Sequence, residues 1–173
     1  MKFVIVGDSG VGKTPLLTTF IEGVFPLEYV PTVFDIKSTE VTVKGQKVKL
    51  YLHDTTGLSD YEAVRVIAYP ETDCFLLCFS LCNKESLASV QNKWYPEIRQ
   101  HCPNAPIILV GTMLDIRQDT SKQKDPSNIV SSSEGEKTRK SLKAVKYVEC
   151  SALTQEGLKE VFEKAVKTCL SKK

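Results

Sequence analysis

Residues 7–14, Gly-Asp-Ser-Gly-Val-Gly-Lys-Thr, fit the pattern GxxxxGK(S/T) and constrain the fold of this chain more than any other feature. They follow a short apolar run at 2–6 and precede a helical pattern at 14–22. A strand, a glycine-rich turn and a helix in this order form a loop whose backbone N–H groups point inward and bind phosphate, assisted by the helix dipole. The pattern therefore predicts a phosphate-binding loop.

Each part of this loop has an expected task. The backbone at Ser9, Gly10, Val11 and Gly12 would surround phosphate oxygens. Lys13 would reach the β- and γ-phosphates, and the Thr14 hydroxyl would occupy a Mg²⁺ position. The alternative, a chance match in a glycine-containing turn, is rare in a chain with nine glycines, and the strand and helix on either side make it rarer.

Strand and helix signals alternate along the whole chain of 173 residues, which we expect to form a single domain over 1–173. The expected strands are 2–6, 36–44, 47–53, 73–80, 107–111 and 147–150, with a hairpin turn at Gly45-Gln46. The expected helices are 14–22, a segment from the N-cap Asn83 to about 101 that Pro96 bends, 133–142, and a last helix capped by Thr154. This order predicts an α/β fold of the P-loop NTPase type: a six-stranded, mostly parallel sheet with one antiparallel edge strand and helices on both faces.

Two further motifs follow predicted strands, where ligands bind in such folds. Asp54-Thr55-Thr56-Gly57 offers a carboxylate for Mg²⁺ and a glycine N–H for a γ-phosphate, although DxxG alone is more often an ordinary turn. Asp115, in Thr112-Met113-Leu114-Asp115, can accept hydrogen bonds from the N1–H and amine of guanine, a donor pair that adenine lacks; a helix-capping aspartate is the alternative. Ser151, Ala152 and Leu153 could add a backbone N–H for the guanine oxygen.

With these motifs in place, the phosphate loop resembles that of Ras-type small GTPases. Three longer segments resemble the Rho/Rac branch: YVPTVFD, WYPEIRQHCPNAPIILVGT and VKYVECSALTQEGLKEVF. The resemblance implies a GTP/GDP-binding switch with Mg²⁺ that hydrolyses GTP. It also implies that Phe25 stacks on guanine, that Tyr29 borders the nucleotide, and that Thr32 ligates Mg²⁺ beside Thr14 and Asp54.

The same resemblance defines the regions that respond to the nucleotide. The first switch would span about 25–35 and the second about 57–70, both ordered by the γ-phosphate. Effector proteins would bind around Val33, Phe34 and Tyr61, and exchange factors and activating proteins are further expected partners. Residues 122–133 occupy the place of the Rho-type insert but are shorter and less regular.

Three residues depart from the family pattern in a way that predicts slow hydrolysis. Leu58 stands where these enzymes use glutamine to orient the attacking water, and leucine has no donor or acceptor. Ser9 replaces the usual glycine beside the γ-phosphate, and Thr56 replaces the usual alanine. Lys13, Thr32 and Gly57 would complete the catalytic set.

Two more departures predict weaker nucleotide binding and faster exchange. Pro15 has no N–H for the α-phosphate contact that the family makes there. Met113 replaces the lysine of the usual (N/T)KxD motif, so the ammonium beside the base is absent.

Composition narrows the setting. A net charge of +2 gives no reason to expect a nucleic-acid partner. Six cysteines without CxxC pairs indicate reduced thiols in a cytoplasmic protein. Cys74, Cys78 and Cys82 recur every four residues, but the surrounding DCFLLCFSLC predicts a buried strand and not a metal-binding helix face. The ending Cys169-Leu170-Ser171-Lys172-Lys173 does not fit CaaX, so we expect plasma-membrane attachment only through a lipidated tail that this sequence does not include.

The leading interpretation is therefore a Rho-type signalling GTPase that acts on effectors, and through them on the actin cytoskeleton. The alternative is a non-cycling, constitutively GTP-bound interaction module, which Leu58, Pro15 and Met113 favour. The intact YVPTVFD segment favours a surface that responds to the γ-phosphate.

Overall fold

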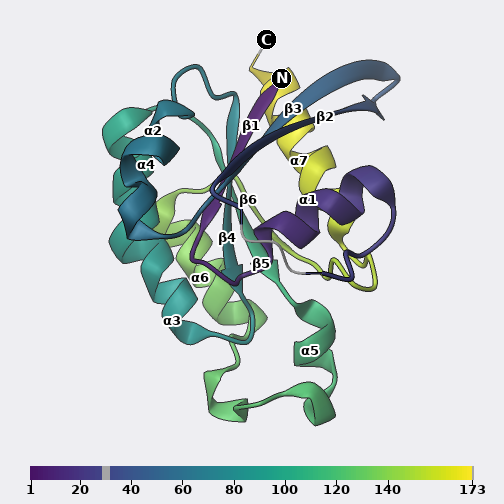
Figure 1. Ribbon diagram of the computed structural model, residues 1–173, viewed down its shortest axis with the longest axis vertical. Helices are drawn as coiled ribbons and strands as arrows, with labels where there is room; N and C mark the ends of the chain where they lie inside the picture. Colours follow the sequence, from purple (N-terminus) through teal and green to yellow (C-terminus); the bar gives the residue numbers. More distant parts are fainter. Residues whose placement is uncertain (29–31, 173) are drawn as a thin grey trace.

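A computed structural model describes residues 1–28 and 32–172. The described part contains a six-stranded sheet in the order β2-β3-β1-β4-β5-β6 (Figure 1). Every neighbouring pair is parallel except β2–β3, and β2 lies at the edge. The predicted fold class is thus confirmed. The strands are β1 Lys2–Gly7, β2 Phe34–Val43, β3 Gln46–Thr55, β4 Cys74–Ser80, β5 Ile107–Thr112 and β6 Lys146–Glu149.

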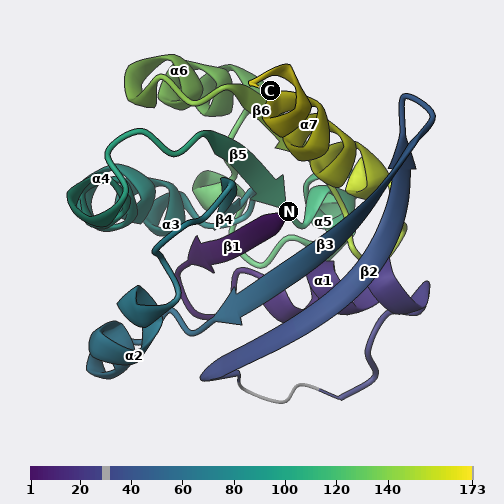
Figure 2. The same ribbon diagram turned by 90° about the horizontal axis from the view of Figure 1, so that it is seen from above.

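Helices cover both faces of this sheet (Figure 2). Their bounds are α1 Lys13–Glu22, α2 Glu62–Ile67, α3 Lys84–Ser89, α4 Tyr95–His101, α5 Leu114–Gln118, α6 Ser132–Leu142 and α7 Leu158–Ser171. Short turns of other helical types are η1 Ser59–Tyr61, η2 Val90–Trp94, η3 Thr120–Lys122 and η4 Pro126–Asn128.

Alternation along the central strands divides the buried side chains between the two faces. In β1, Phe3 and Ile5 join the core under α1 and α7, whereas Val4 and Val6 join the core under α3 and α4. Successive strand residues point to opposite faces, so a strand covered on both sides is apolar throughout. Cys74 and Cys78 lie in β4, fully buried among apolar residues, as the sequence predicted. Cys82 does not fit that prediction, because β4 ends at Ser80 and Cys82 is only partly buried.

The last helix begins later than predicted. α7 starts at Leu158 after Gly157, which has φ 71°. Thr154 does not cap it, because the Thr154 hydroxyl accepts a hydrogen bond from the Glu156 amide instead. The predicted apolar face is correct, since its members are buried: Leu158, Val161, Phe162, Ala165 and Val166.

The helix predicted from Asn83 to about 101 is divided before Pro96, not at it. The Asn83 side chain accepts hydrogen bonds from the Glu85 and Ser86 amides, so this N-cap is confirmed. The π-helical segment η2 then separates α3 from α4. Pro96 lies in the first turn of α4, where its missing N–H removes no hydrogen bond of that helix. Neither the single-turn η2 nor α2 and α5 were predicted.

The hairpin between β2 and β3 turns one residue earlier than expected. Val43 pairs with Gln46, and the two turn residues, Lys44 and Gly45, have φ 51° and φ 76°. Two left-handed residues are the mark of a type I′ turn, whose twist suits a two-residue hairpin. Lysine carries a Cβ that disfavours this conformation.

Parallel pairing brings the ends of β1, β3, β4, β5 and β6 to one edge of the sheet. The register Ile5↔Asp54 aligns the end of β3 with the start of the phosphate loop. The residues after β5 and β6 reach the same edge, so all the predicted motifs meet there. Within the described ranges, none of the helices is both long enough and apolar enough to cross a bilayer.

Changing Lys44→Asn should stabilise the protein, because asparagine adopts the left-handed region more readily than lysine. We expect the free energy of unfolding in urea to rise by roughly 0.5–1 kcal/mol. The matched control is Lys47→Asn, the same change in the β3 strand, which should be neutral or destabilising. An equal gain from both variants would show that the loss of positive charge, not the turn, is responsible.

Candidate functional site

The phosphate loop is wrapped around its own lysine. Lys13 is buried, and its Nζ donates hydrogen bonds to the carbonyl oxygens of Gly7 (2.8 Å) and Asp8 (2.7 Å). An ammonium has three N–H donors, so one remains for a ligand in the loop. Gly10 and Gly12 have φ 79° and φ 90°, which lets the backbone curl with its amides facing inward. Burial lowers the pKa of Lys13, a cost that an anion in the loop would offset.

Helix α1 starts directly from this loop. Leu16 makes the first helical hydrogen bond, to the Gly12 carbonyl at 3.0 Å. The amides before Leu16 have no partner within the helix, so Pro15 removes a donor that the helix itself does not need. The fold therefore tolerates Pro15, while a phosphate loses one amide.

Three oxygen-bearing side chains converge beside the loop. Thr14 Oγ1 donates to Asp54 Oδ2 at 2.6 Å and lies 3.0 Å from Thr32 Oγ1. Asp54 is buried, and its Oδ1 has no hydrogen-bond partner among the described residues. Burial raises the pKa of this carboxyl group. A carboxylate and two hydroxyls form a hard-oxygen set of the kind Mg²⁺ prefers, and an unpartnered buried oxygen fits such an ion.

A second set of residues lines a small pocket on the other side of the loop. Ser151 Oγ donates to Asp115 Oδ1 at 2.8 Å, which orients the carboxylate. Ala152 and Phe25 line this pocket as well, with Met113. Met113 Cε lies 3.8 Å from where a Cβ on Gly12 would be, so this uncharged side chain reaches the phosphate loop.

The start of the predicted second switch lies against the loop. A Cβ on Gly57 would approach Ser9 N to 2.4 Å and Gly7 O to 2.5 Å, so only glycine fits. Leu58 is half exposed and, with Ser9 and Thr56, lines a pocket of about 320 Å³ that also contains Lys13 and Thr32. The Thr56 hydroxyl accepts a hydrogen bond from the Leu58 amide at 3.2 Å.

A comparison with protein families decides the identity. The family model described as "Ras: Ras family" matches residues 2–171, nearly the whole chain. This protein belongs to the Ras family. It is accordingly a small GTPase with the P-loop GTPase fold, and the motifs at the sheet edge are those of a guanine-nucleotide switch.

Most of the residues predicted for this GTPase's nucleotide site do lie together, but some differ from expectation in how they are placed. Thr112 is buried and lines the base pocket, and its hydroxyl donates to the Val11 carbonyl at 2.6 Å, so it also ties the loop to β5. Val11 is buried too, so only its backbone can face a phosphate. Leu153 is half exposed and does not line the base pocket. Tyr29 lies outside the described residues.

One residue beside the Thr14–Asp54–Thr32 oxygen cluster was not predicted from the sequence. Lys37, in β2, donates from Nζ to Thr18 Oγ1 in α1 at 3.1 Å, and both line a pocket shared with Thr14 and Thr32. The contact joins β2 to α1. The only signal in the sequence was a lysine in an inward-facing register position, which patterning alone reads as a solvent-exposed strand residue.

Replacing Asp54→Asn should stabilise this GTPase when neither nucleotide nor Mg²⁺ is present. Because burial raises the Asp54 pKa in the folded state, the ionised carboxylate lowers stability once the pH is above that pKa. We expect a gain of about 1 kcal/mol in the free energy of unfolding near neutral pH, shrinking in acid where Asp54 is protonated.

The measurement is urea unfolding of protein stripped with a chelator, at neutral and acid pH. Asp125→Asn is the control, since Asp125 caps a surface turn and asparagine caps equally well. A loss of stability in Asp54→Asn at neutral pH would contradict the analysis.

Proposed function

We propose that this protein is a Rho-type switch that binds GTP and GDP with Mg²⁺ and hydrolyses GTP slowly. The observation that supports the proposal best is the convergence at one sheet edge of the buried Lys13 ammonium, the Thr14–Asp54–Thr32 oxygen cluster and the oriented Asp115 carboxylate. A cation, a Mg²⁺-type oxygen set and a guanine acceptor are the three recognition elements that a guanosine triphosphate requires.

In this proposal the loop amides from Ser9 to Thr14 surround the phosphates, and Lys13 binds the terminal pair. Bound Mg²⁺ would neutralise the phosphate charge and hold the β- and γ-oxygens in place. Thr14 and Thr32 would ligate the ion directly, and Asp54 would hold it, usually through a water. Because Thr32 belongs to the first switch, its place beside Thr14 couples that switch to the ion.

Asp115 would select guanine over adenine. Its carboxylate is oriented by the Ser151 hydroxyl, and Ser151 also accepts a hydrogen bond from the Thr154 amide at 3.0 Å, which fixes the loop after β6. The Ala152 backbone would bind the guanine oxygen, and Phe25 would stack on the ring. Thr112 would line this pocket, and Leu153 would follow Ala152 at its rim.

Slow hydrolysis follows from the side chains around the pocket for the terminal phosphate. Leu58 presents only hydrocarbon where a water would have to be oriented. The Thr56 hydroxyl is used within the chain, accepting from the Leu58 amide, and Ser9 adds a side chain that would crowd an arginine from an activating protein. Losing one preorganised group of this kind costs about 3–4 kcal/mol in transition-state stabilisation.

Exchange should be faster than in typical relatives. Pro15 removes an amide from the α-phosphate site, and Met113 brings an uncharged methyl group toward Gly12 where the family motif has a lysine. Each missing contact costs about 1 kcal/mol or more. Slow hydrolysis and ready exchange would both favour the GTP-bound form.

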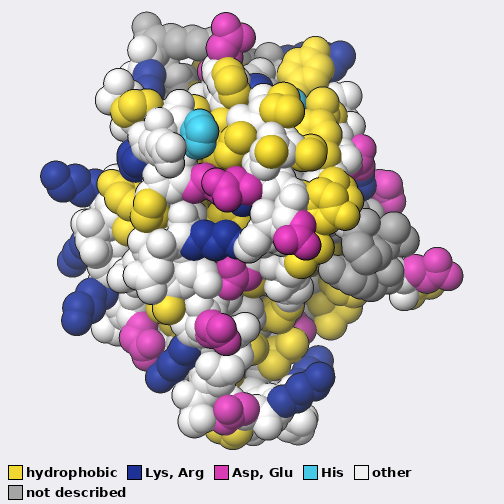
Figure 3. Space-filling view, turned by 60° about the vertical axis from the view of Figure 1, so that its left-hand side comes forward, with side chains coloured by type: hydrophobic (Ala, Val, Ile, Leu, Met, Phe, Trp, Pro, Cys, Tyr) yellow, Lys and Arg dark blue, Asp and Glu magenta, His cyan; other side chains and the backbone are white. Residues whose placement is uncertain are grey.

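Effector proteins would bind the surface formed by both switches. Large apolar side chains are exposed there from two sides of the site: Val33, Phe34, Ile36, Leu58, Tyr61, Val64 and Ile67. Figure 3 looks toward the side of the molecule that carries α2 and shows hydrophobic side chains clustered among charged ones. We propose Rho-type effectors and actin regulation on the resemblance of three segments to the Rho/Rac branch: YVPTVFD, WYPEIRQHCPNAPIILVGT and VKYVECSALTQEGLKEVF. A cytoplasmic protein that reaches the plasma membrane through a lipidated tail would suit that role.

Isothermal titration calorimetry tests the nucleotide assignment. We expect purified, nucleotide-stripped protein to bind GTP and GDP with Mg²⁺ and to bind ATP at least 10²-fold more weakly, because Asp115 has no donor pair to accept from adenine. Asp115→Ala should remove most of this preference while leaving binding of the phosphates. Equal affinity for guanosine and adenosine nucleotides would refute the proposal.

Leu58→Gln should accelerate single-turnover GTP hydrolysis, on the order of 10²-fold, by restoring a group that can orient water. Adding Ser9→Gly and Thr56→Ala should increase the rate further. The control is Val145→Gln. Val145 is an exposed apolar residue that precedes β6, at the opposite end of that strand from the pocket, so this change should leave the rate unchanged.

The same assay distinguishes a slow switch from the alternative, a non-cycling module. If the triple variant still fails to turn over GTP, and bound nucleotide does not exchange, the protein holds GTP constitutively and the switch proposal is wrong. Faster single-turnover hydrolysis in the variants that carry Leu58→Gln supports a switch in which Leu58 slows the reaction.

A further inference from the structure

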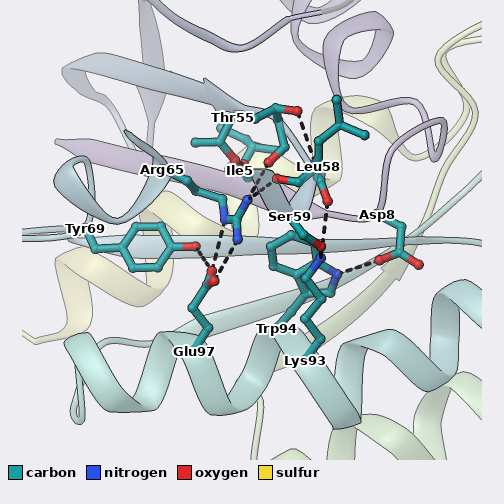
Figure 4. A network of polar contacts seen from close by, with 12 residues as sticks. Ile5, Asp8, Thr55, Leu58, Ser59, Arg65, Tyr69, Lys93, Trp94 and Glu97 are labelled. Carbon is teal, nitrogen blue, oxygen red and sulfur yellow. Dashed lines mark hydrogen bonds and ion pairs between the residues drawn. The ribbon is translucent and has the colours of Figure 1, made fainter. Parts of the chain in front are cut away.

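The chain's tryptophan lies at the centre of a network between the second switch and the phosphate loop (Figure 4). Trp94 is fully buried in η2, and its Nε1 donates to Asp8 Oδ1 of the loop at 2.9 Å. Two cations lie over its ring, with Arg65 Cζ 4.6 Å and Lys93 Nζ 4.5 Å from the centroid. Cation–π contacts of this kind are strongest where water is excluded.

Both cations also hold the backbone where the second switch begins. Arg65 Nη1 donates to the carbonyl oxygens of Thr56 (3.0 Å) and Leu58 (3.2 Å). Lys93 Nζ donates to the carbonyl oxygen of Gly57 and to Ser59 Oγ, both at 3.3 Å. Three consecutive carbonyls, 56 to 58, are therefore held by two side chains that share one aromatic ring.

Because the peptide bond is planar, these contacts also fix the direction of the Gly57 N–H. A trans peptide is planar, so its N–H points away from its C=O. The Gly57 N–H belongs to the same peptide as the Thr56 carbonyl, and fixing that carbonyl fixes the direction of the N–H. Lys93 fixes the peptide on the other side of Gly57. Glycine has more backbone freedom than other residues, so it gains most from being held on both sides.

Arg65 is itself immobilised. It is fully buried, and its Nε and Nη2 donate to Glu97 at 3.1 and 2.7 Å in a bidentate pair. Tyr69 OH donates to the same carboxylate at 2.5 Å. A planar guanidinium held at a carboxylate by two hydrogen bonds keeps its remaining N–H directions fixed. The Gly57 backbone, in contact with Ser9 N and Gly7 O, is thus set against the loop by a rigid support.

We propose that Arg65, Lys93 and Trp94 are positioning residues that orient the Gly57 amide toward the terminal phosphate of bound GTP. The inference rests on the proposed function of the site. GDP has no phosphate at that place, so the network contributes to GTP affinity and not to GDP affinity. The network therefore determines the preference for GTP over GDP, whereas the phosphate loop binds both nucleotides.

The experiment compares affinities for GDP and a non-hydrolysable GTP analogue, each with Mg²⁺, by calorimetry. Lys93→Met keeps the length of the side chain and removes the ammonium, and it should weaken binding of the GTP analogue about five- to tenfold while leaving GDP binding within twofold. Arg65→Lys should do the same or more, because a lysine cannot hold two carbonyls and Glu97 together. Lys93→Arg, which keeps a donor, should restore most of the preference.

Lys84→Met is the matched control, since Lys84 is exposed on α3 and only its backbone amide makes a hydrogen bond among the described residues, to Asn128. It should leave both affinities unchanged. If the buried Arg65→Lys variant does not fold, as judged by circular dichroism, the partly exposed Lys93 decides the question alone.

Equal weakening of both nucleotides in Lys93→Met, or no change in either, would overturn the inference, because it would indicate a merely structural role. Failure of the unmodified protein to bind guanine nucleotides would instead refute the proposed function. The two failures are therefore distinguishable.

Discussion

The pairing of β3 beside β1 is the constraint on which the rest of the site depends. Because the two strands are parallel and in the register Ile5↔Asp54, the chain leaving β3 meets the chain leaving β1. Asp54 then reaches Thr14, and Gly57 touches the backbone of Ser9. A shift of one residue in this register would turn the Asp54 side chain to the other face of the sheet and separate the carboxylate from the hydroxyls.

The site also shows what this arrangement costs the protein without a ligand. Lys13 is a buried cation whose only described hydrogen-bond partners are two carbonyls, and Asp54 keeps one oxygen unpartnered. Burial disfavours the charged form of each. A bound triphosphate with Mg²⁺ would offset the cost of burying both charges, since the phosphates would pair with Lys13 and the cation with Asp54. The same two buried charges therefore lower the stability of the protein without ligand and increase its affinity for a ligand that neutralises them.

Much of this could be predicted from the sequence because the deciding residues are local. The phosphate loop, the DxxG turn and the order of the six strands each depend on neighbouring residues, and the structure places them as expected, whereas the short helices α2 and α5 were not predicted. The start of α7 and the hairpin turn were wrong by one to a few residues, since Gly157 and Lys44 take left-handed conformations that propensity does not specify. The Arg65–Glu97–Trp94 network and the Lys37–Thr18 contact join residues distant in the chain, and no short pattern indicates such contacts.

Trp94 is the chain's single tryptophan, so the intrinsic fluorescence of the protein comes mainly from one place. Its indole N–H is bound to the phosphate loop, and its ring lies under two cations that hold the second switch. Any movement of either segment changes the charges next to the indole and hence its emission. The molecule thus carries an intrinsic fluorophore between the phosphate loop and residues 56–58, and it needs no label.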